Sequence, residues 1–171
     1  RYVRVDFFGL ARIIDALGGI DVDSVSEAEA EQIRKYCYDK NTKITSGRNL
    51  HLNGAEAVAY GRIRKMDSDF KRTDRQREVF KKMVNKALKM DKAKVLALVR
   101  EHMRNVTTNF TEQELADLAV SLITAGFDKD IAELQVPAEG TFAMTTKKGA
   151  SVIEMDIEKN KETIRKFIYG K

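Results

Sequence analysis

Hydrophobic and polar residues at the start of the chain follow the spacing of a strand, then that of a helix, then that of a strand again. Residues 2–7 alternate, and residues 20–25 alternate in the same way. Between them, apolar residues recur at helical spacing up to the Gly18-Gly19 stop, namely Leu10, Ile13, Ile14 and Leu17. This order predicts an α/β fold, a central mixed sheet flanked by helices, with residues 1–7 and 20–25 as neighbouring strands.

Other elements are predicted from apolar periodicity and from capping residues. Ser26 with Glu29 and Thr111 with Glu114 have the spacing of capping boxes, which mark two helix starts. The predicted helices cover residues 26–38, 54–60, 73–90, about 95–103, 111–126 and about 156–169. Residues 39–49 predict an irregular polar loop, and residues 131–136 and 141–146 predict a hairpin joined across 137–140.

Arginines are concentrated where the short helix at 54–60 leads into the long helix at 73–90. If Arg62-Ile63-Arg64 is extended, both guanidinium groups point to one side and Ile63 points into the core. The buried face of the long helix, projected back by one turn, includes Gln76 and Arg72. These two residues are therefore expected at the inner edge of the helix N-terminus, where free N–H groups and the helix dipole favour an anion.

A structural interpretation of the same segment stays open. Thr73-Asp74-Arg75-Gln76 fits a capping box, and arginines interleaved with aspartates often form a solvated, salt-bridged face. Two guanidinium groups ~6 Å apart, however, repel by about 3 kcal/mol at an effective dielectric of 20. Converging arginines therefore favour a multiply charged anion such as phosphate or pyrophosphate, which Arg binds bidentately.

Composition narrows the class of protein without choosing a ligand. The 171 residues suit one domain, the 43% apolar content suffices for a core, and the net charge of +5 with a pI near 9.2 favours anionic partners.

The single Cys37 excludes an internal disulfide and is expected to be a buried thiol. His51 and His102 have no ligand-spaced companion, so a zinc site is not expected. No stretch has the length of a membrane span and no signal peptide is recognisable.

A longer motif around the arginines resembles the LytR-CpsA-Psr family. The matching residues are Gly47, Leu50, Leu52-Asn53-Gly54, Ala57, Ala59-Tyr60, Arg62-Ile63-Arg64, Asp67, Asp69-Phe70, Arg72-Thr73 and Arg75-Gln76. Upstream, Val5-Asp6-Phe7 and Ile14 to Ile20 are similar to the strand and helix that precede this motif in the family. Lys71 departs from the glycine usual in the family, which affects only the local turn.

The resemblance implies a bacterial phosphotransferase that acts outside the membrane. Such enzymes attach glycopolymers, among them wall teichoic acid and capsular polysaccharide, from a polyprenyl pyrophosphate carrier to peptidoglycan. The chain would be the C-terminal part, residues 1–171, of one such domain, with the N-terminal half and a membrane-anchoring helix upstream. For a partial domain, an unpaired sheet edge or an edge completed by another chain is expected.

The resemblance also assigns roles to individual residues. Arg62, Arg64 and Arg72 match the pyrophosphate-binding arginines and Gln76 a polar residue beside the same head group, so these four are the predicted catalytic residues. Arg75 matches the same motif and joins them as a predicted contact to the pyrophosphate lipid. Mg²⁺ or Mn²⁺ is implied as a cofactor, with ligands outside this chain. The polyprenyl tail needs an apolar cleft, for which the helices at 10–17 and 79–88 are candidate walls, although the same residues suit an ordinary core.

Two other functions compete with this one. The first is a non-enzymatic module of the transcriptional-attenuator type, which could bind nucleic acid or another polyanion through its basic surface. No helix is uniformly basic, however, and no aromatics are interleaved with the arginines. Nucleic acid is therefore not expected as a partner. Steep salt dependence of DNA binding would support that module. A protein that binds polyprenyl phosphate lipid without turnover is the third possibility.

Overall fold

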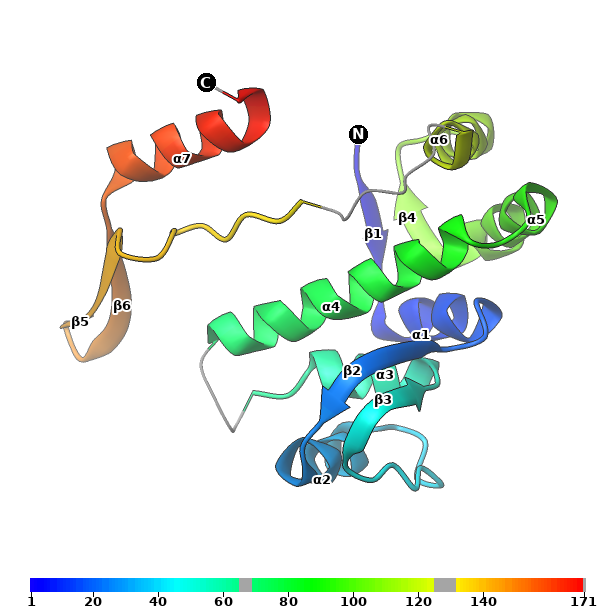
Figure 1. Ribbon diagram of the computed structural model, residues 1–171, viewed down its shortest axis with the longest axis horizontal. Helices are drawn as coiled ribbons and strands as arrows, with labels where there is room; N and C mark the ends of the chain where they lie inside the picture. Colours follow the sequence, from blue (N-terminus) through cyan, green and yellow to red (C-terminus); the bar gives the residue numbers. More distant parts are fainter. Residues whose placement is uncertain (65–68, 125–131, 171) are drawn as a thin grey trace. The chain divides into compact units, whose positions relative to one another are not determined.

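The computed structural model describes residues 1–64, 69–124 and 132–170 and divides into two compact units (Figure 1). The first unit spans Arg1–Asp128 and the second Lys129–Lys171. In chain order, the first unit contains β1 (Val3–Val5), α1 (Phe7–Ala16), β2 (Ile20–Val25), α2 (Glu27–Tyr36), β3 (Gly47–Leu52), α3 (Gly54–Gly61), α4 (Asp69–Leu88), α5 (Lys92–His102), the 3-10 turn η1 (Met103–Asn105), β4 (Val106–Thr108) and α6 (Glu112–Thr124). The second unit contains β5 (Phe142–Lys147), β6 (Ala150–Met155) and α7 (Ile157–Tyr169).

The predicted α/β class is confirmed, but the strand pairing differs from the expectation. Among the described residues, β1 pairs with β4, β2 with β3 and β5 with β6, each antiparallel. Residues 1–7 and 20–25 are therefore not neighbouring strands, and that prediction is wrong. Alternation of side chains shows which face of a strand is buried, whereas the partner strand is chosen by contacts between distant parts of the chain.

The core of the first unit lies under the β2–β3 ribbon. Ile20, Val22 and Val25 of β2 are buried while Asp21 and Asp23 are exposed, as the alternation predicts. Helices α1, α2 and α3 and the first half of α4 close this core, and they contribute to it Ile14, Ile33, Tyr60 and Val79 among other residues. Cys37 is fully buried there, as expected, and burial raises the pKa of its thiol.

The long helix α4 is continuous, as predicted, but it begins earlier than residue 73. It starts at Asp69, so Thr73 lies inside the helix and cannot cap it. The capping box expected for Thr73 and Gln76 is therefore wrong. The capping boxes at Ser26–Glu29 and Thr111–Glu114 are confirmed by reciprocal hydrogen bonds between each side chain and the backbone of the other residue.

Three strands differ from the prediction. The predicted loop at 39–49 ends in β3, which begins at Gly47, and β4 was not predicted. The hairpin joins β5 to β6 through Lys148 and Gly149, both with positive φ, and residues 132–136 are not a strand; residue 131 lies outside the described ranges. Lysine is an uncommon residue for a left-handed turn position, so the turn had no recognisable sequence signal.

In the second unit, a buried asparagine joins the hairpin to α7. Asn160 Oδ1 accepts from the Ala138 N–H at 2.8 Å, and Asn160 Nδ2 donates to Thr141 Oγ1 at 2.8 Å. Asp156 caps α7, and its contacts lower the pKa of its carboxyl, chiefly through the backbone N–H of Lys159. In the part of the chain that the structure describes, no helix combines the length and the apolarity needed to cross a bilayer.

Candidate active site

The arginine segment is positioned by α3, a short helix that is buried along its whole length. Asn53 caps the helix and forms a capping box with Glu56. Asp15 of α1 accepts a hydrogen bond from the Gly54 N–H at 2.6 Å, and a side chain at Gly54 would overlap the backbone of Ala11. The two helices therefore pack in close contact, which fixes where the C-terminus of α3 lies.

Arg62 ends α3 rather than beginning an extended segment. Its backbone has φ −100° and ψ −4°, and its N–H donates to the carbonyl of Ala59 at 3.1 Å. The extended conformation expected at Arg62 is therefore wrong, because the last turn of α3 continues through this residue. Ile63 is fully buried, as expected, and both Arg62 and Arg64 are exposed.

The Arg62 guanidinium lies over the ring of Phe7, the first residue of α1, at 4.5 Å from the ring centroid. This cation–π contact restrains the position of the guanidinium. Phe7 was not among the predicted site residues. An aromatic residue at a helix start gives no sequence signal for a contact with an arginine more than fifty residues away.

Arg75 anchors the same segment from α4. It is 5% exposed, its Nη2 donates to the carbonyl oxygen of Ile63 at 3.0 Å, and its Nη1 lies 3.3 Å from Glu29 Oε1. Its guanidinium is 6.0 Å from the ring centroid of Tyr60. Arg75 thus binds the backbone between Arg62 and Arg64, an arrangement that suits a positioning residue.

Gln76 holds the residue before Arg62. Its Nε2 donates to the carbonyl oxygen of Gly61 at 3.1 Å. Because α4 starts at Asp69, Gln76 lies about two turns inside the helix, so its expected place at the helix N-terminus is wrong; Arg72 lies in the first turn. Arg72 and Gln76 are four residues apart and therefore share one side of α4. The structure thus brings the backbone of residues 61–63 against the first two turns of α4, where Arg72 lies.

A second buried contact beneath the segment involves Tyr60. Its hydroxyl donates to Glu78 Oε2 at 2.8 Å, and Glu78 Oε1 accepts from the Asp23 N–H at 3.1 Å. Burial, followed by the bond to Glu78, raises the pKa of Tyr60. Tyr60 therefore stays a neutral donor, and the contact ties α3, α4 and β2 together under the exposed arginines.

An apolar cavity of about 330 Å³ is lined in part by α1 and α4. Ile13 of α1 and Leu17, the C-cap of that helix, line it, as do Phe80, Met83, Val84 and Ala87 of α4. The remaining lining residues come from β1, α5, η1, β4 and α6, and all except His102 are apolar. Both predicted wall helices also contribute to the core, through Ile14 and Val79. Periodicity identified the apolar faces but could not separate residues that face a cavity from residues that face the core.

The cavity and the arginine segment follow one another along the same two helices. On α4, Arg72, Arg75 and Gln76 precede Phe80, the first residue of that helix to line the cavity, and one helical turn of about 6 Å separates Gln76 from Phe80. On α1, Phe7 lies under Arg62, and Ile13 lines the cavity further along. Within the described ranges, no group of three or more His, Cys, Asp or Glu side chains is placed to hold a metal ion.

The structure is therefore an α/β domain in which an arginine-bearing segment at the end of a buried helix lies next to an apolar cavity. The profile of the LytR_cpsA_psr family matches residues 1–167, so the chain belongs to this family. The match extends across both compact units.

Individual relatives agree with this assignment. The chain is 35% identical over 131 residues to the polyisoprenyl-teichoic acid–peptidoglycan teichoic acid transferase TagV of Bacillus subtilis, covering 74% of this chain and 32% of TagV. It is 29% identical over 145 residues to TagU of Bacillus cereus, a transferase of the same name, covering 81% of this chain and 43% of TagU. The crystal structure of B. subtilis TagV superposes with a TM-score of 0.71 at 29% identity, covering 98% of this chain and 63% of that one. The chain spans less than half of the length of the curated relatives TagV and TagU.

Proposed function

We propose that the protein is part of an extracytoplasmic phosphotransferase that moves a glycopolymer from a polyprenyl pyrophosphate carrier to peptidoglycan. The order of features along α1 and α4 supports this most directly, because a cationic segment is followed at once by an apolar cavity. A polyprenyl pyrophosphate has the same order, with a multiply charged head and a hydrocarbon tail. Relatives named as teichoic acid–peptidoglycan transferases point to the same substrates.

In this proposal the arginines act on the pyrophosphate. Arg62, Arg64 and Arg72 bind the phosphate oxygens, and Gln76 and Arg75 hold the backbone of residues 61–63 so that Arg62 and Arg64 present their guanidinium groups together. A hydroxyl oxygen of the acceptor sugar attacks the phosphorus that carries the glycopolymer. The bond from this phosphorus to the bridging oxygen breaks, polyprenyl phosphate leaves with the electron pair, and the hydroxyl proton passes to a base or to solvent. The arginines stabilise the charge that develops on the leaving phosphate.

The location and the cofactor are also proposals. Action outside the membrane and anchoring by an upstream helix rest on the family. A divalent cation, Mg²⁺ or Mn²⁺, would offset phosphate charge when bound. The described residues bring no group of three metal-ligating side chains together to hold it.

The test separates head-group binding from tail binding in the complete protein. Each charge-assisted contact to phosphate contributes about 1.5 to 3 kcal/mol, so Arg64→Ala is expected to weaken polyprenyl pyrophosphate binding by roughly 10- to 150-fold. Arg48→Ala removes the same charge from an exposed position on β3 and is the matched control. Unchanged glycopolymer transfer by Arg64→Ala would refute the catalytic assignment.

Ala87→Phe tests the tail. The added phenyl group enters the apolar cavity and is expected to weaken binding of the prenyl chain, whereas a short, water-soluble pyrophosphate should bind as before. Ala97→Phe adds the same group at an exposed position of α5 and serves as the control. If Ala87→Phe binds the lipid as tightly as the unmodified protein, the cavity is not the tail site.

A further inference from the structure

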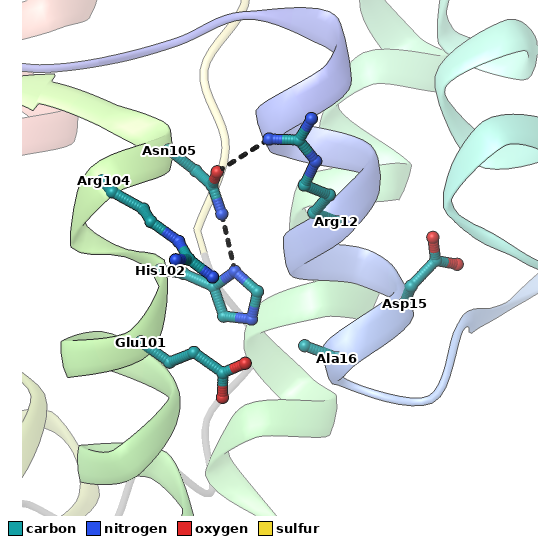
Figure 2. Close-up of a pocket in the computed structure, with 7 residues that line it drawn as sticks. All are labelled: Arg12, Asp15, Ala16, Glu101, His102, Arg104 and Asn105. Carbon is teal, nitrogen blue, oxygen red and sulfur yellow. Dashed lines mark hydrogen bonds between the residues drawn. The ribbon is translucent and has the colours of Figure 1, made fainter.

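A second, polar cleft lies between α1 and the end of α5 with η1 (Figure 2). Its volume is about 510 Å³. Arg12, Asp15 and Ala16 line it from α1, and Glu101, His102, Arg104 and Asn105 line it from the other side. None of these residues belongs to the arginine segment or to the predicted site.

A chain of hydrogen bonds in the cleft determines where His102 carries its proton. Arg12 Nη1 donates to Asn105 Oδ1 at 3.1 Å, so the other end of this amide, Nδ2, is a donor. Asn105 Nδ2 lies 2.7 Å from His102 Nδ1, which must therefore accept. The other ring nitrogen of His102, Nε2, is then the one that carries a proton.

The Nε2–H of His102 is buried and has no hydrogen-bond partner within the described part of the chain. Buried donors are rarely left without an acceptor, because the lost hydration is not replaced. An acceptor atom on a bound ligand would satisfy this donor.

Other groups in the cleft are available to a ligand as well. Glu101 and Arg104 are exposed, and neither side chain forms a hydrogen bond or ion pair among the residues that the structure describes. Asp15 uses one carboxylate oxygen to accept from Gly54. The cleft thus offers donors from Arg12, Arg104 and His102 together with acceptors from Asp15 and Glu101.

The balance of charge identifies the class of ligand. Two arginines and two carboxylates line the cleft, so these four side chains carry no excess formal charge. The carboxylates Asp15 and Glu101 repel a polyphosphate. A ligand with hydroxyl, amide and mixed-charge groups can use both the donors and the acceptors.

The cleft also lies close to the proposed lipid site. His102 lines both the polar cleft and the apolar cavity, so the two share one wall. Along α1, Arg12 is five residues beyond Phe7, which contacts Arg62, and five residues correspond to about 8 Å of helix.

We propose that this cleft binds the acceptor, a peptidoglycan strand with N-acetylated sugars and a peptide stem that carries both amine and carboxylate groups. This inference rests on the proposed transfer reaction and names the site of its second substrate. Hydroxyl and amide hydrogens of the acceptor bind Asp15 and Glu101, and its carbonyl and carboxylate oxygens bind Arg12, Arg104 and His102 Nε2–H.

The test is titration of the complete protein with a soluble disaccharide-peptide fragment of peptidoglycan, followed by calorimetry. Glu101→Ala and Arg104→Ala are each expected to weaken fragment binding about five- to tenfold, and His102→Phe, which keeps the ring but removes the donor, by a similar factor. Lys94→Ala, an exposed change on α5 outside the cleft, should leave binding unchanged. In transfer assays, Glu101→Ala and Arg104→Ala should raise KM for the acceptor and leave kcat unchanged.

Two outcomes would overturn the inference. One is equal affinity of the fragment for Glu101→Ala, Arg104→Ala and the unmodified protein; the other is displacement of the fragment by a soluble polyphosphate at equal concentration in the Arg64→Ala background. Binding of polyprenyl pyrophosphate, measured separately, distinguishes the two proposals. If Arg64→Ala keeps full lipid binding while Arg104→Ala loses the fragment, the lipid assignment fails and the cleft stands; the reverse result removes only the cleft.

Discussion

Replacing Arg75 by methionine tests whether this residue is an anchor of the arginine segment. Methionine keeps most of the apolar stem of the side chain but removes the charge and every donor. The lost contacts include the hydrogen bond to the Ile63 carbonyl at 3.0 Å and the ion pair with Glu29 at 3.3 Å. The side chains of this pair are 6% and 19% exposed, so solvent replaces little of the lost contact.

Breaking a buried pair by removing one member costs about 3 to 5 kcal/mol, because the remaining charge stays buried without its partner. We therefore expect Arg75→Met to lower the free energy of unfolding by that amount, which is a large share of the total for a domain of this size. Arg64→Ala, at an exposed position, should change it by less than about 0.5 kcal/mol.

Urea denaturation of the two variants and of the unmodified protein provides the measurement, with m-values compared to confirm that the midpoints report stability. Glu29→Gln and the double variant complete a cycle, and the double variant should be less destabilised than the sum of the two single changes. A loss below about 1 kcal/mol for Arg75→Met would show that the pair is not an anchor.

Two further predictions concern α3. The raised pKa of Tyr60 means that the folded protein holds this proton more tightly than the unfolded chain, so its contribution to stability is complete below pH about 10 and is lost as the pH rises above that value. Tyr60→Phe should therefore flatten the alkaline loss of stability in denaturation curves recorded from about pH 8 to 11, and an unchanged slope would contradict the assignment. Gly54→Ala places a methyl group against the backbone of Ala11 and should destabilise the protein by about 2 to 4 kcal/mol. Thermal denaturation measures this loss. The comparison is Ala97→Gly, at an exposed position of α5, which should cost about 1 kcal/mol.

Local sequence patterns determined the features that depend on neighbouring residues. The capping boxes at Ser26 and Thr111, the continuous helix that includes Val79 and the burial of Ile63 were predicted correctly, because each depends on residues within about two helical turns. The motif from Gly47 to Gln76 likewise sufficed to identify the family, because it is a contiguous stretch of the chain.

Only the tertiary structure decided which distant residues meet. The pairing of β1 with β4, the contact of Arg62 with Phe7 and the burial of Arg75 against Glu29 each join segments far apart in the chain. No periodicity encodes such contacts, because they depend on how whole elements pack. For the same reason the sequence could not show that α1 and α4 divide their apolar residues between a core and a cavity, or that Arg12 and His102 line one cleft.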